Sequence, residues 1–377
     1  MLENYRTTGE RAVELKNFIE KITPPVIAFG GINISAISGG NIVVKKHMDI
    51  LRKAGKIVYG VESMKYYEGD EWQTLNRSDD AKYDIFRINS QRKTEKVNLN
   101  MNFDRFVATF WGSVDMVDDY KYMRRNSKKL YLVQNMEDGF YRGTDRIRRE
   151  VIATYRNDRI EPITISKWCQ SWLKSKYNRD AKYAPNGINL DNFPFKERNF
   201  KNRKIKILVE GDSASEYKRV DESFEITNKL DPEKYEVSYL SYNAAPKDWY
   251  HVDNTYLKVS PDKVGSVYAE HDILVKSSVL ESFSYPPLEM MATGGVSVLV
   301  RNDGNAEYVR DGENALYYNA GDIEDAISKI ESIVSDTDKF HKIAKAGRRT
   351  ADERKWENIE KEVRRSEERR VGKECRS

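Results

Sequence analysis

The chain has 377 residues, of which 39% are hydrophobic and 33% are charged, and its formal net charge is +4 at pH 7. This length favours two domains, and the composition excludes a disordered chain. The last fourteen residues hold six basic and three acidic side chains, so the rest is nearly neutral and nucleic acid is not an expected partner.

Apolar runs and helical patterns alternate in the first half of the chain. Residues 26–29 predict a buried strand, and the spacing of Val44, Met48 and Leu51 predicts a helix that ends at Gly55. A strand at 56–61 completes a βαβ unit. Further strands are expected at 84–88, 105–111, 129–134 and 163–166, and a helix at 167–177.

The alternation restarts after a turn-rich stretch at residues 183–191, which predicts a linker. Strands are expected at 203–209, 235–240, 272–275, 296–300 and 315–318, and helices at 221–229, 264–268, 287–293 and 322–335. Two such halves predict an α/β protein with two doubly wound Rossmann-like domains that face each other across a cleft. Ligands bind such sheets at the carboxyl ends of the strands, so the cleft is the expected site.

We expect an N-terminal domain at residues 1–190, a second domain at 191–350, and a helix at 351–365 that packs back toward the first domain. Residues 366–377 lack apolar periodicity and indicate a tail that is not native. Residues 1–23 predict a helix that packs on its own domain, with contact to a membrane surface as the alternative.

The sequence lacks the signs of a membrane or secreted protein. No apolar run approaches the roughly 20 residues that a membrane span needs, and residues 1–23 hold no signal-peptide core. The cysteines Cys169 and Cys375 cannot build a disulfide framework, and the four histidines are too scattered to predict a metal site. We therefore expect a cytoplasmic protein without a metal or cofactor.

The segment from Glu281 to Glu289 carries the strongest chemical signal. Ser282, Ser284 and the pair Pro286-Pro287 lead into a short helix, with Glu289 expected in its first turn. A helix N-terminus binds phosphate well. An ionised carboxylate repels phosphate but can accept hydrogen bonds from two neighbouring hydroxyl groups. This combination fits a nucleotide sugar, and the alternative is a helix capped by ordinary acidic residues.

The run Glu281-Ser-Phe-Ser-Tyr-Pro-Pro-Leu-Glu289, followed by Gly294-Gly295, resembles the signature of family 4 glycosyltransferases with the GT-B fold. The resemblance covers most of residues 25–360 and continues at Asp303-Gly304, Glu307, 309–316 and 322–327, with 183–193 similar to the inter-domain linker. It implies a retaining, metal-independent hexosyltransferase that uses a nucleotide sugar as donor, without a cofactor. Residues 1–190 are then the acceptor side, and residues 191–350 bind the donor.

A narrower resemblance lies in Tyr131-Leu-Val-Gln-Asn-Met-Glu-Asp-Gly-Phe-Tyr141, which is similar to a run in bacterial rhamnosyltransferases that build cell-surface polysaccharides. It implies rhamnose as the sugar and a glycan, free or lipid-linked, as the acceptor. A lipid-linked acceptor would bring the protein to the inner face of the membrane.

The family resemblance also implies roles for individual residues. Glu281 and Lys218 are the catalytic candidates. The family's usual arginine near the end of the preceding strand is missing, because Glu210-Gly211-Asp212 stands there, so Arg219 or Lys276 is left as the second basic group. The donor-binding candidates are Gly39, Gly40, Gly211, Lys218, Arg219, Lys276, Ser282, Phe283, Ser284, Tyr285 and Glu289.

Several of these residues have a simpler interpretation. Lys218 is alternatively a solvated loop lysine, and Gly39-Gly40 alternatively forms only a tight turn. The acceptor-side candidates Gln134, Asn135, Glu137 and Asp138 follow a strand end, where a polar loop start is equally expected. Trp111 and Trp168 are expected in packing rather than as sugar platforms, and Asp115 to Asp119 as an exposed helix start rather than a metal motif.

Two other functions compete with sugar transfer. A non-catalytic GT-B-like subunit that binds glycan or a partner transferase is favoured by the missing arginine, but the presence of both Glu281 and Glu289 argues against it. A nucleotide-sugar epimerase of the same fold would not need the linker and the signature together.

Overall fold

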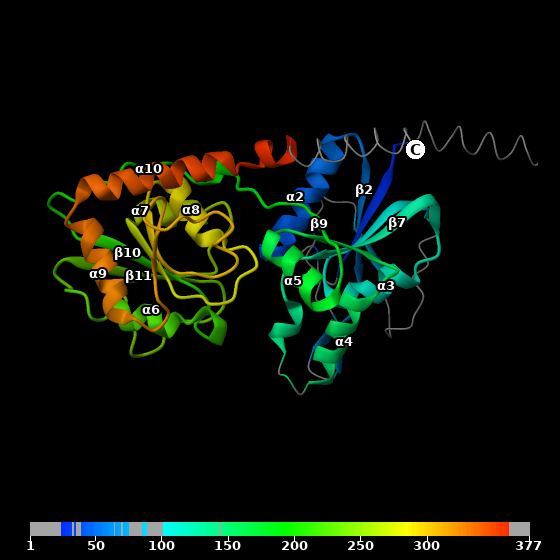
Figure 1. Cartoon of the computed structure of the whole chain (residues 1–377), viewed down its shortest axis with the longest axis horizontal. Coiled ribbons are helices and arrows are strands. Elements are labelled where there is room, and N and C mark those ends of the chain that lie inside the picture. Colours follow the sequence, from blue (N-terminus) through cyan, green and yellow to red (C-terminus); the bar gives the residue numbers. More distant parts are fainter. Residues whose placement is uncertain are drawn as a thin grey trace, which may run out of the picture. The chain divides into compact units, whose positions relative to one another are not determined.

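The computed structural model describes residues 24–31, 34, 39–63, 65–68, 71–74, 85–88, 101–141, 143 and 145–361. These residues form two compact units (Figure 1). The first unit ends at Tyr183 and the second begins at Ala184, except that Ile165–Trp168 belong to the second unit. The predicted helix at 1–23 and the tail at 366–377 lie outside the described residues. None of the described helices is both long and apolar enough to cross a membrane.

The first unit is built on a sheet of seven parallel strands. In spatial order these are β5 (Ile85–Ile88), β2 (Ile57–Ser63), β1 (Val26–Gly31), β6 (Phe103–Ala108), β7 (Met123–Val133), β8 (Glu161–Thr164) and β9 (Lys182–Tyr183). From β1 the chain runs to one edge of the sheet through β2 and β5, and it returns to the other side of β1 with β6. This reversal defines a doubly wound, Rossmann-like sheet.

Burial explains why these residues form strands and helices. All six residues of β1 are buried, as expected for a parallel strand that is covered on both faces. Helix α2 (Gly39–Lys53) directs Val43, Val44 and Met48 into the core. The other α-helices of this unit are α3 (Val114–Asp119), α4 (Arg146–Arg156) and α5 (Lys167–Tyr177). Figure 1 shows helices flanking the strands of the unit.

The second unit repeats the plan with six parallel strands. In spatial order these are β12 (Asn254–Leu257), β11 (Tyr235–Ser241), β10 (Ile205–Glu210), β13 (Ile273–Lys276), β14 (Val296–Val300) and β15 (Leu316–Tyr318). Its α-helices are α6 (Val220–Thr227), α7 (Val264–Glu270), α8 (Tyr285–Thr293), α9 (Ile323–Val334) and α10 (Thr337–Glu353). The order of the strands reverses between β10 and β13, so this is again a Rossmann-like sheet.

A buried guanidinium joins several segments of the second unit. Arg198 is only 4% exposed. It donates to the carbonyl oxygens of His271, Thr293 and Tyr268 at 3.0, 3.0 and 3.2 Å. The carboxylate of Asp272 lies 3.6 Å away. Arg198 therefore connects the chain before β10 to the ends of α7 and α8.

The structure confirms the predicted α/β class with two Rossmann-like sheets. It also contains elements that were not predicted: helix α4, the edge strand β12, and a hairpin of β3 (Lys65–Glu68) and β4 (Glu71–Thr74). The predicted helix at 351–365 is wrong at its start, because α10 already begins at Thr337 and is followed by helical residues 356–361. β12 was missed because its residues are largely exposed and form no apolar run.

Candidate functional site

The reversal in the second sheet brings charged side chains together. β10 ends at Glu210, and its neighbour β13 ends at Lys276. Lys276 Nζ lies 2.5 Å from Glu210 Oε2 and 3.5 Å from Glu281 Oε1. Lys218 Nζ donates to the same Glu281 oxygen at 2.7 Å. Two ammonium groups and two carboxylates therefore converge at the carboxyl edge of the sheet, where doubly wound sheets bind ligands. We call these four residues the charge cluster.

Mutual attraction keeps the central pair of this cluster ionised. Burial by itself would raise the pKa of Glu281, but Lys218 and Lys276 outweigh burial, and the pKa lies below its ordinary value. Burial also opposes the charge on Lys218, but the carboxylates of Glu281 and Glu210 outweigh it and raise the pKa of Lys218. Lys218 and Glu281 therefore form an ion pair throughout the neutral pH range.

The loop after β13 leads into helix α8, which begins at Tyr285. Prolines occupy its first turn, and the side chain of its N-cap residue, Ser284, makes no capping hydrogen bond. The first amide groups of a helix have no partner within the helix, but Pro286 and Pro287 carry no N–H, so of the first three residues only Tyr285 offers an amide to an anion. The predicted helix start at Pro287 is two residues late, and the placement of Glu289 in the first turn is therefore wrong.

The predicted loop residues Ser282, Phe283 and Ser284 have buried side chains. The ring of Phe283 packs edge-on against Tyr285, with 4.9 Å between the ring centroids. The Ser284 hydroxyl has no hydrogen-bond partner among the described residues. The buried side chains thus anchor the loop that leads into α8.

Glu289 is half-buried in the second turn of α8. Burial and the nearby carboxylate of Glu210 raise the pKa of Glu289 to about 7, although the Tyr268 hydroxyl and Lys276 act in the opposite direction. A carboxyl group with this pKa changes between its protonated and ionised forms near neutral pH. Its ability to accept hydrogen bonds from a ligand therefore depends on pH.

The loop after β10 places Lys218. Gly211 has a φ of 147°, and a Cβ at this position would lie 3.0 Å from Val220 Cγ2, so glycine lets the chain turn here. Arg219 follows Lys218, and its guanidinium pairs with Glu222 of α6. Lys276 and Arg219 were the two predicted alternatives for a second basic group. Lys276 lies beside Glu281, whereas Arg219 pairs with Glu222.

A second loop, residues 301–307, is locked against the loop that carries Glu281. Asn302 Nδ2 donates to the carbonyl oxygen of Ser278 at 2.8 Å. Asn302 and Asn305 also exchange two backbone-to-side-chain hydrogen bonds, of 3.0 and 2.9 Å. A Cβ at Gly304 would lie 2.8 Å from the backbone carbonyl oxygen of Glu281, closer than real Cβ contacts. Glycine at 304 therefore permits the position of Glu281.

In the first unit, the predicted glycine pair and Gln134 lie close together. Gly39 and Gly40 begin helix α2 rather than forming a separate tight turn. A Cβ at Gly40 would lie 3.4 Å from the Gln134 side-chain amide, which donates to the Thr109 carbonyl oxygen at 3.4 Å. Asn135 accepts a hydrogen bond from the next backbone amide at 2.8 Å. Gln134 and Asn135 remain partly exposed at the carboxyl edge of this sheet.

The acceptor-side candidates Glu137 and Asp138 do not reach the surface. They are 3% and 0% exposed. Glu137 Oε2 accepts hydrogen bonds from the Trp111 backbone amide at 2.8 Å and from the Tyr131 hydroxyl at 2.9 Å. Asp138 lies 3.4 Å from Arg148. Aromatic packing, which includes the buried Trp111, thus encloses both carboxyl groups inside the unit.

The enclosure of Glu137 predicts how the stability of the first unit depends on pH. Burial raises the pKa of Glu137 from 4.5 to about 8, partly opposed by its hydrogen bonds from Trp111 and Tyr131. The unfolded chain therefore loses this proton at lower pH than the folded one. The protonated Glu137 carboxyl group therefore contributes fully to the free energy of unfolding below about pH 4.5. This contribution declines as the pH rises toward 8, by at most about 1.4 kcal/mol per pH unit. Glu137→Gln cannot ionise, so its free energy of unfolding, measured in urea, should decline less steeply over this range.

Glu150→Gln on helix α4 serves as the control, because Glu150 pairs at the surface with Arg146. It should keep the pH profile of the parent protein. Equal slopes for Glu137→Gln and the parent would contradict a buried, neutral Glu137.

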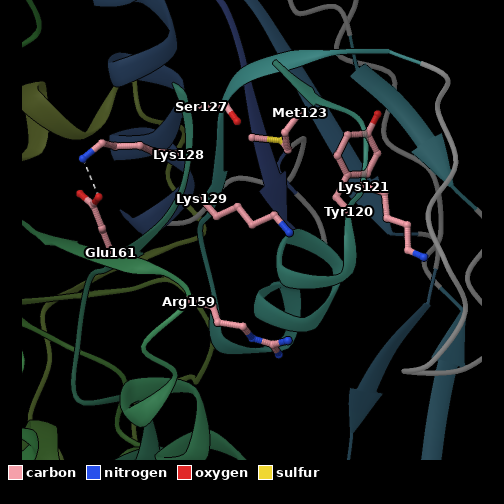
Figure 2. A pocket seen from close by; sticks show the side chains of 8 residues that line it. All are labelled: Tyr120, Lys121, Met123, Ser127, Lys128, Lys129, Arg159 and Glu161. Carbon is pink, nitrogen blue, oxygen red and sulfur yellow. Dashed lines mark hydrogen bonds and ion pairs between the residues drawn. The ribbon is translucent and has the colours of Figure 1, made fainter. Parts of the chain in front are cut away.

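A separate pocket of about 410 Å³ lies at the amino ends of β7 and β8 (Figure 2). Three of its basic side chains already have partners. Lys128 pairs with Glu161 at 2.6 Å, and Lys129 and Arg159 bind the backbone carbonyl and the carboxylate of Asp118. Asp118 is buried, so the expected exposed helix start is wrong there. The pocket lies at the opposite edge of its sheet from Gln134 and holds none of the predicted site residues.

Sequence reasoning noted Glu210 only as a departure from the family pattern and did not pair it with Lys276. The sequence does indicate both residues, because Glu210 is the charged residue that ends β10 and Lys276 is the charged residue that ends the apolar run of β13. The two side chains could be paired only once β10 and β13 were known to be neighbours in the sheet.

Comparison with known proteins finds similarity over the segment that holds this site. Residues 196–350, which contain the charge cluster and Glu289, match the family model described as Glycosyl transferases group 1. The lipopolysaccharide core biosynthesis glycosyltransferase LpsE of Rhizobium meliloti (strain 1021) is 37% identical over 79 residues, which are 21% of this chain and 23% of that protein. The matched stretches span about a fifth of the length of the curated relatives.

Two solved structures resemble nearly the whole chain. Sucrose-phosphate synthase from Thermosynechococcus elongatus has a TM-score of 0.70 at 14% identity, covering 92% of this chain and 99% of that chain. Anabaena Alr3699/HepE, solved in complex with UDP-glucose, has a TM-score of 0.68 at 12% identity, covering 90% and 98%. At these identities the likeness concerns the fold. The fold is thus GT-B, and the segment at residues 196–350 is the one that matches glycosyl transferases group 1.

Proposed function

We propose that this protein is a glycosyltransferase that moves a sugar from a nucleoside-diphosphate sugar to a hydroxyl group of a glycan. The observation that carries the proposal is the convergence of Lys218 and Lys276 on Glu281 at the carboxyl edge of the second sheet. The uncapped start of α8 follows the same loop. Ammonium groups and helix amides suit a diphosphate, and carboxylates suit sugar hydroxyls.

In the proposed reaction, the bond between the anomeric carbon and the diphosphate oxygen breaks, and the acceptor oxygen bonds to that carbon with retention of configuration. Lys218, Lys276 and the Tyr285 amide at the start of α8 stabilise the charge on the leaving diphosphate, without a metal ion or cofactor. A leaving phosphate oxygen takes the acceptor proton. Glu281 contacts the donor sugar, and Glu289 holds the ribose diol.

The sugar and the acceptor are proposed from weaker support. The resemblance of residues 131–141 to rhamnosyltransferases favours rhamnose, and the match to LpsE favours a bacterial cell-surface glycan as the acceptor. Gln134 and Asn135 are the proposed acceptor contacts. A lipid-linked acceptor would bring the protein to the inner membrane face. Nucleoside diphosphate released from dTDP-rhamnose but not from UDP-glucose would support rhamnose, and the reverse pattern would refute it.

A thermal-shift experiment with UDP, GDP, ADP and dTDP tests the donor site. A ligand that binds only the folded protein stabilises it by mass action and so raises Tm. At a ligand concentration of one hundred times Kd, the free energy of unfolding increases by about 2.7 kcal/mol. One of the four should raise Tm more than the others. The affinity for it should increase as pH rises through about 7, because Glu289 then ionises and accepts hydrogen bonds from the ribose diol.

Glu289→Gln is the matched variant, since it keeps the shape of the side chain but cannot ionise. It should bind the same nucleoside diphosphate more weakly above pH 7 and lose the rise with pH. Protonation of the ligand phosphate affects both proteins equally. The difference between their pH profiles of affinity therefore reports on Glu289. A parent protein that responds to none of the four diphosphates would refute the proposed function.

A non-catalytic GT-B-like subunit is the second candidate, and Glu210 favours it, because a carboxylate lies where a diphosphate would be bound. The two functions differ in one measurement. A transferase releases free nucleoside diphosphate from a panel of nucleotide sugars, and a binding subunit releases none.

A further inference from the structure

Glu210 and Lys276 form an ion pair that the proposed function does not yet explain. Lys276 is 2% exposed and is the last residue of β13, and Glu210 is the last residue of β10. Their side chains meet at 2.5 Å, at the point where the strand order of the sheet reverses. A carboxylate at this point opposes the binding of any phosphate, so its presence requires a reason.

The burial of Lys276 supplies the reason. A buried ammonium group without a hydrogen-bonded anion is unfavourable and tends to lose its proton or turn toward solvent. The nearest alternative anion is Glu281, but its oxygen lies 3.5 Å from Lys276 and already accepts from Lys218 at 2.7 Å. Glu210 is therefore the side chain that fixes the direction of the Lys276 ammonium.

The direction matters because two ammonium groups converge on one carboxylate oxygen. Lys218 reaches Glu281 from the loop after β10, and Lys276 reaches it from the end of β13. The loop from Lys276 continues to Tyr285, the first residue of α8. A diphosphate next to Glu281 would meet both ammonium groups. With Glu210, the four members of the charge cluster sum to zero before a ligand binds, so the two lysines can stay close without repelling each other.

We propose that Glu210 is a positioning residue that holds the Lys276 ammonium beside Glu281, and that Lys276 so held is the second cation for the donor diphosphate. This inference rests on the proposed function. In this chain the second cation comes from the end of β13, and the residue at the end of β10 supplies its anchor.

The test compares how variants bind nucleoside diphosphates and the corresponding monophosphates, measured by calorimetry on the full chain with UDP, GDP, ADP, dTDP and their monophosphates. Lys276→Met should weaken binding of the preferred diphosphate by roughly 10-fold or more, as expected for the loss of a hydrogen bond to a charged group. Glu210→Ala should cause a similar loss. The affinity for the monophosphate should change by less than about threefold in both variants.

Two further variants separate positioning from charge and from folding. Glu210→Gln keeps an oxygen that can accept from Lys276 and should retain the parent affinity within about threefold. The double variant Glu210→Ala/Lys276→Met should bind no more weakly than Lys276→Met alone, because the anchor has no role once the ammonium is gone. The control Glu236→Gln removes the partner of Lys206 at the amino end of the same sheet and should bind as the parent does.

Each alternative result overturns the inference. Glu210→Ala that binds the diphosphate as tightly as the parent, or more tightly, would mean that Glu210 only opposes the ligand. Equal losses for diphosphate and monophosphate would mean that the pair only supports the fold. If Glu210→Ala does not fold, Lys276→Met still tests the inference. A diphosphate affinity equal to that of the parent would show that Lys276 is not the second cation. If the parent protein binds a diphosphate and none of these variants loses affinity for it, the proposed sugar transfer stands, but Lys276 and Glu210 have no role in binding the donor.

Discussion

Replacing Lys218 by alanine is expected to lower kcat for sugar transfer by about two to three orders of magnitude. Preorganised donors directed at a developing negative charge contribute on this scale. Lys218 Nζ lies 2.7 Å from Glu281 Oε1, at the carboxyl edge of the second sheet where the leaving diphosphate is proposed to bind. The measurement is the initial rate at which nucleoside diphosphate is released from a saturating nucleotide sugar in the presence of acceptor.

Lys229→Ala is the matched control, because Lys229 forms an exposed ion pair with Glu324 at 2.8 Å. Exposed pairs of this kind contribute little, so this variant should keep the parent kcat. Lys218→Arg should recover part of the lost rate, since the positive charge is kept. A kcat for Lys218→Ala within about twofold of the parent would remove Lys218 from the mechanism.

Replacing Arg198 by alanine is expected to destabilise the second unit by about 3–5 kcal/mol, the usual cost of breaking a buried, hydrogen-bonded charge. Arg198 donates to the carbonyl oxygens of His271, Thr293 and Tyr268. Burial lowers the pKa of Arg198 to about 10, with Asp272 opposing that effect, so the guanidinium is charged at neutral pH. Its removal takes one donor from each of these three buried carbonyl oxygens and leaves Asp272 with one cation fewer.

The free energy of unfolding in urea measures this effect. Lys201→Ala, at an exposed position three residues further along the chain, is the control and should stay within about 0.5 kcal/mol of the parent. Arg198→Lys should recover little, because one ammonium cannot reach three carbonyl groups that a planar guanidinium spans. A loss below about 1 kcal/mol in Arg198→Ala would contradict the structural role assigned to this side chain.

The fold was predictable where burial leaves a pattern in the sequence. β14 and α5 have the predicted bounds, because fully buried parallel strands read as apolar runs and helices as periodic ones. β12 lies at the edge of its sheet and is largely exposed, so no apolar run marks it. The hairpin of β3 and β4 lies in a stretch rich in charged residues.

The site was predictable only in part, for a different reason. Local order along the chain indicated Glu281 and the start of α8 as candidates for the site. The pairing of Glu210 with Lys276 depends on which strands are neighbours, and local sequence does not contain that information. Glu137 was misplaced because a polar residue after a strand end is usually exposed. Here hydrogen bonds from Trp111 and Tyr131 compensate for its burial.

The contact between residues 301–307 and the loop of Glu281 has a consequence for engineering. Gly304 leaves no room for a side chain against Glu281, and Asn302 is bonded to Ser278. In a mutant library that varies only residues 277–284, the packing of this loop against Gly304 stays the same. Many variants should therefore fail to fold this loop because of steric clashes, whatever the chemistry of their new side chains. Substitutions in the two loops should show strong epistasis, so a library that alters the loop of Glu281 should randomise both loops together.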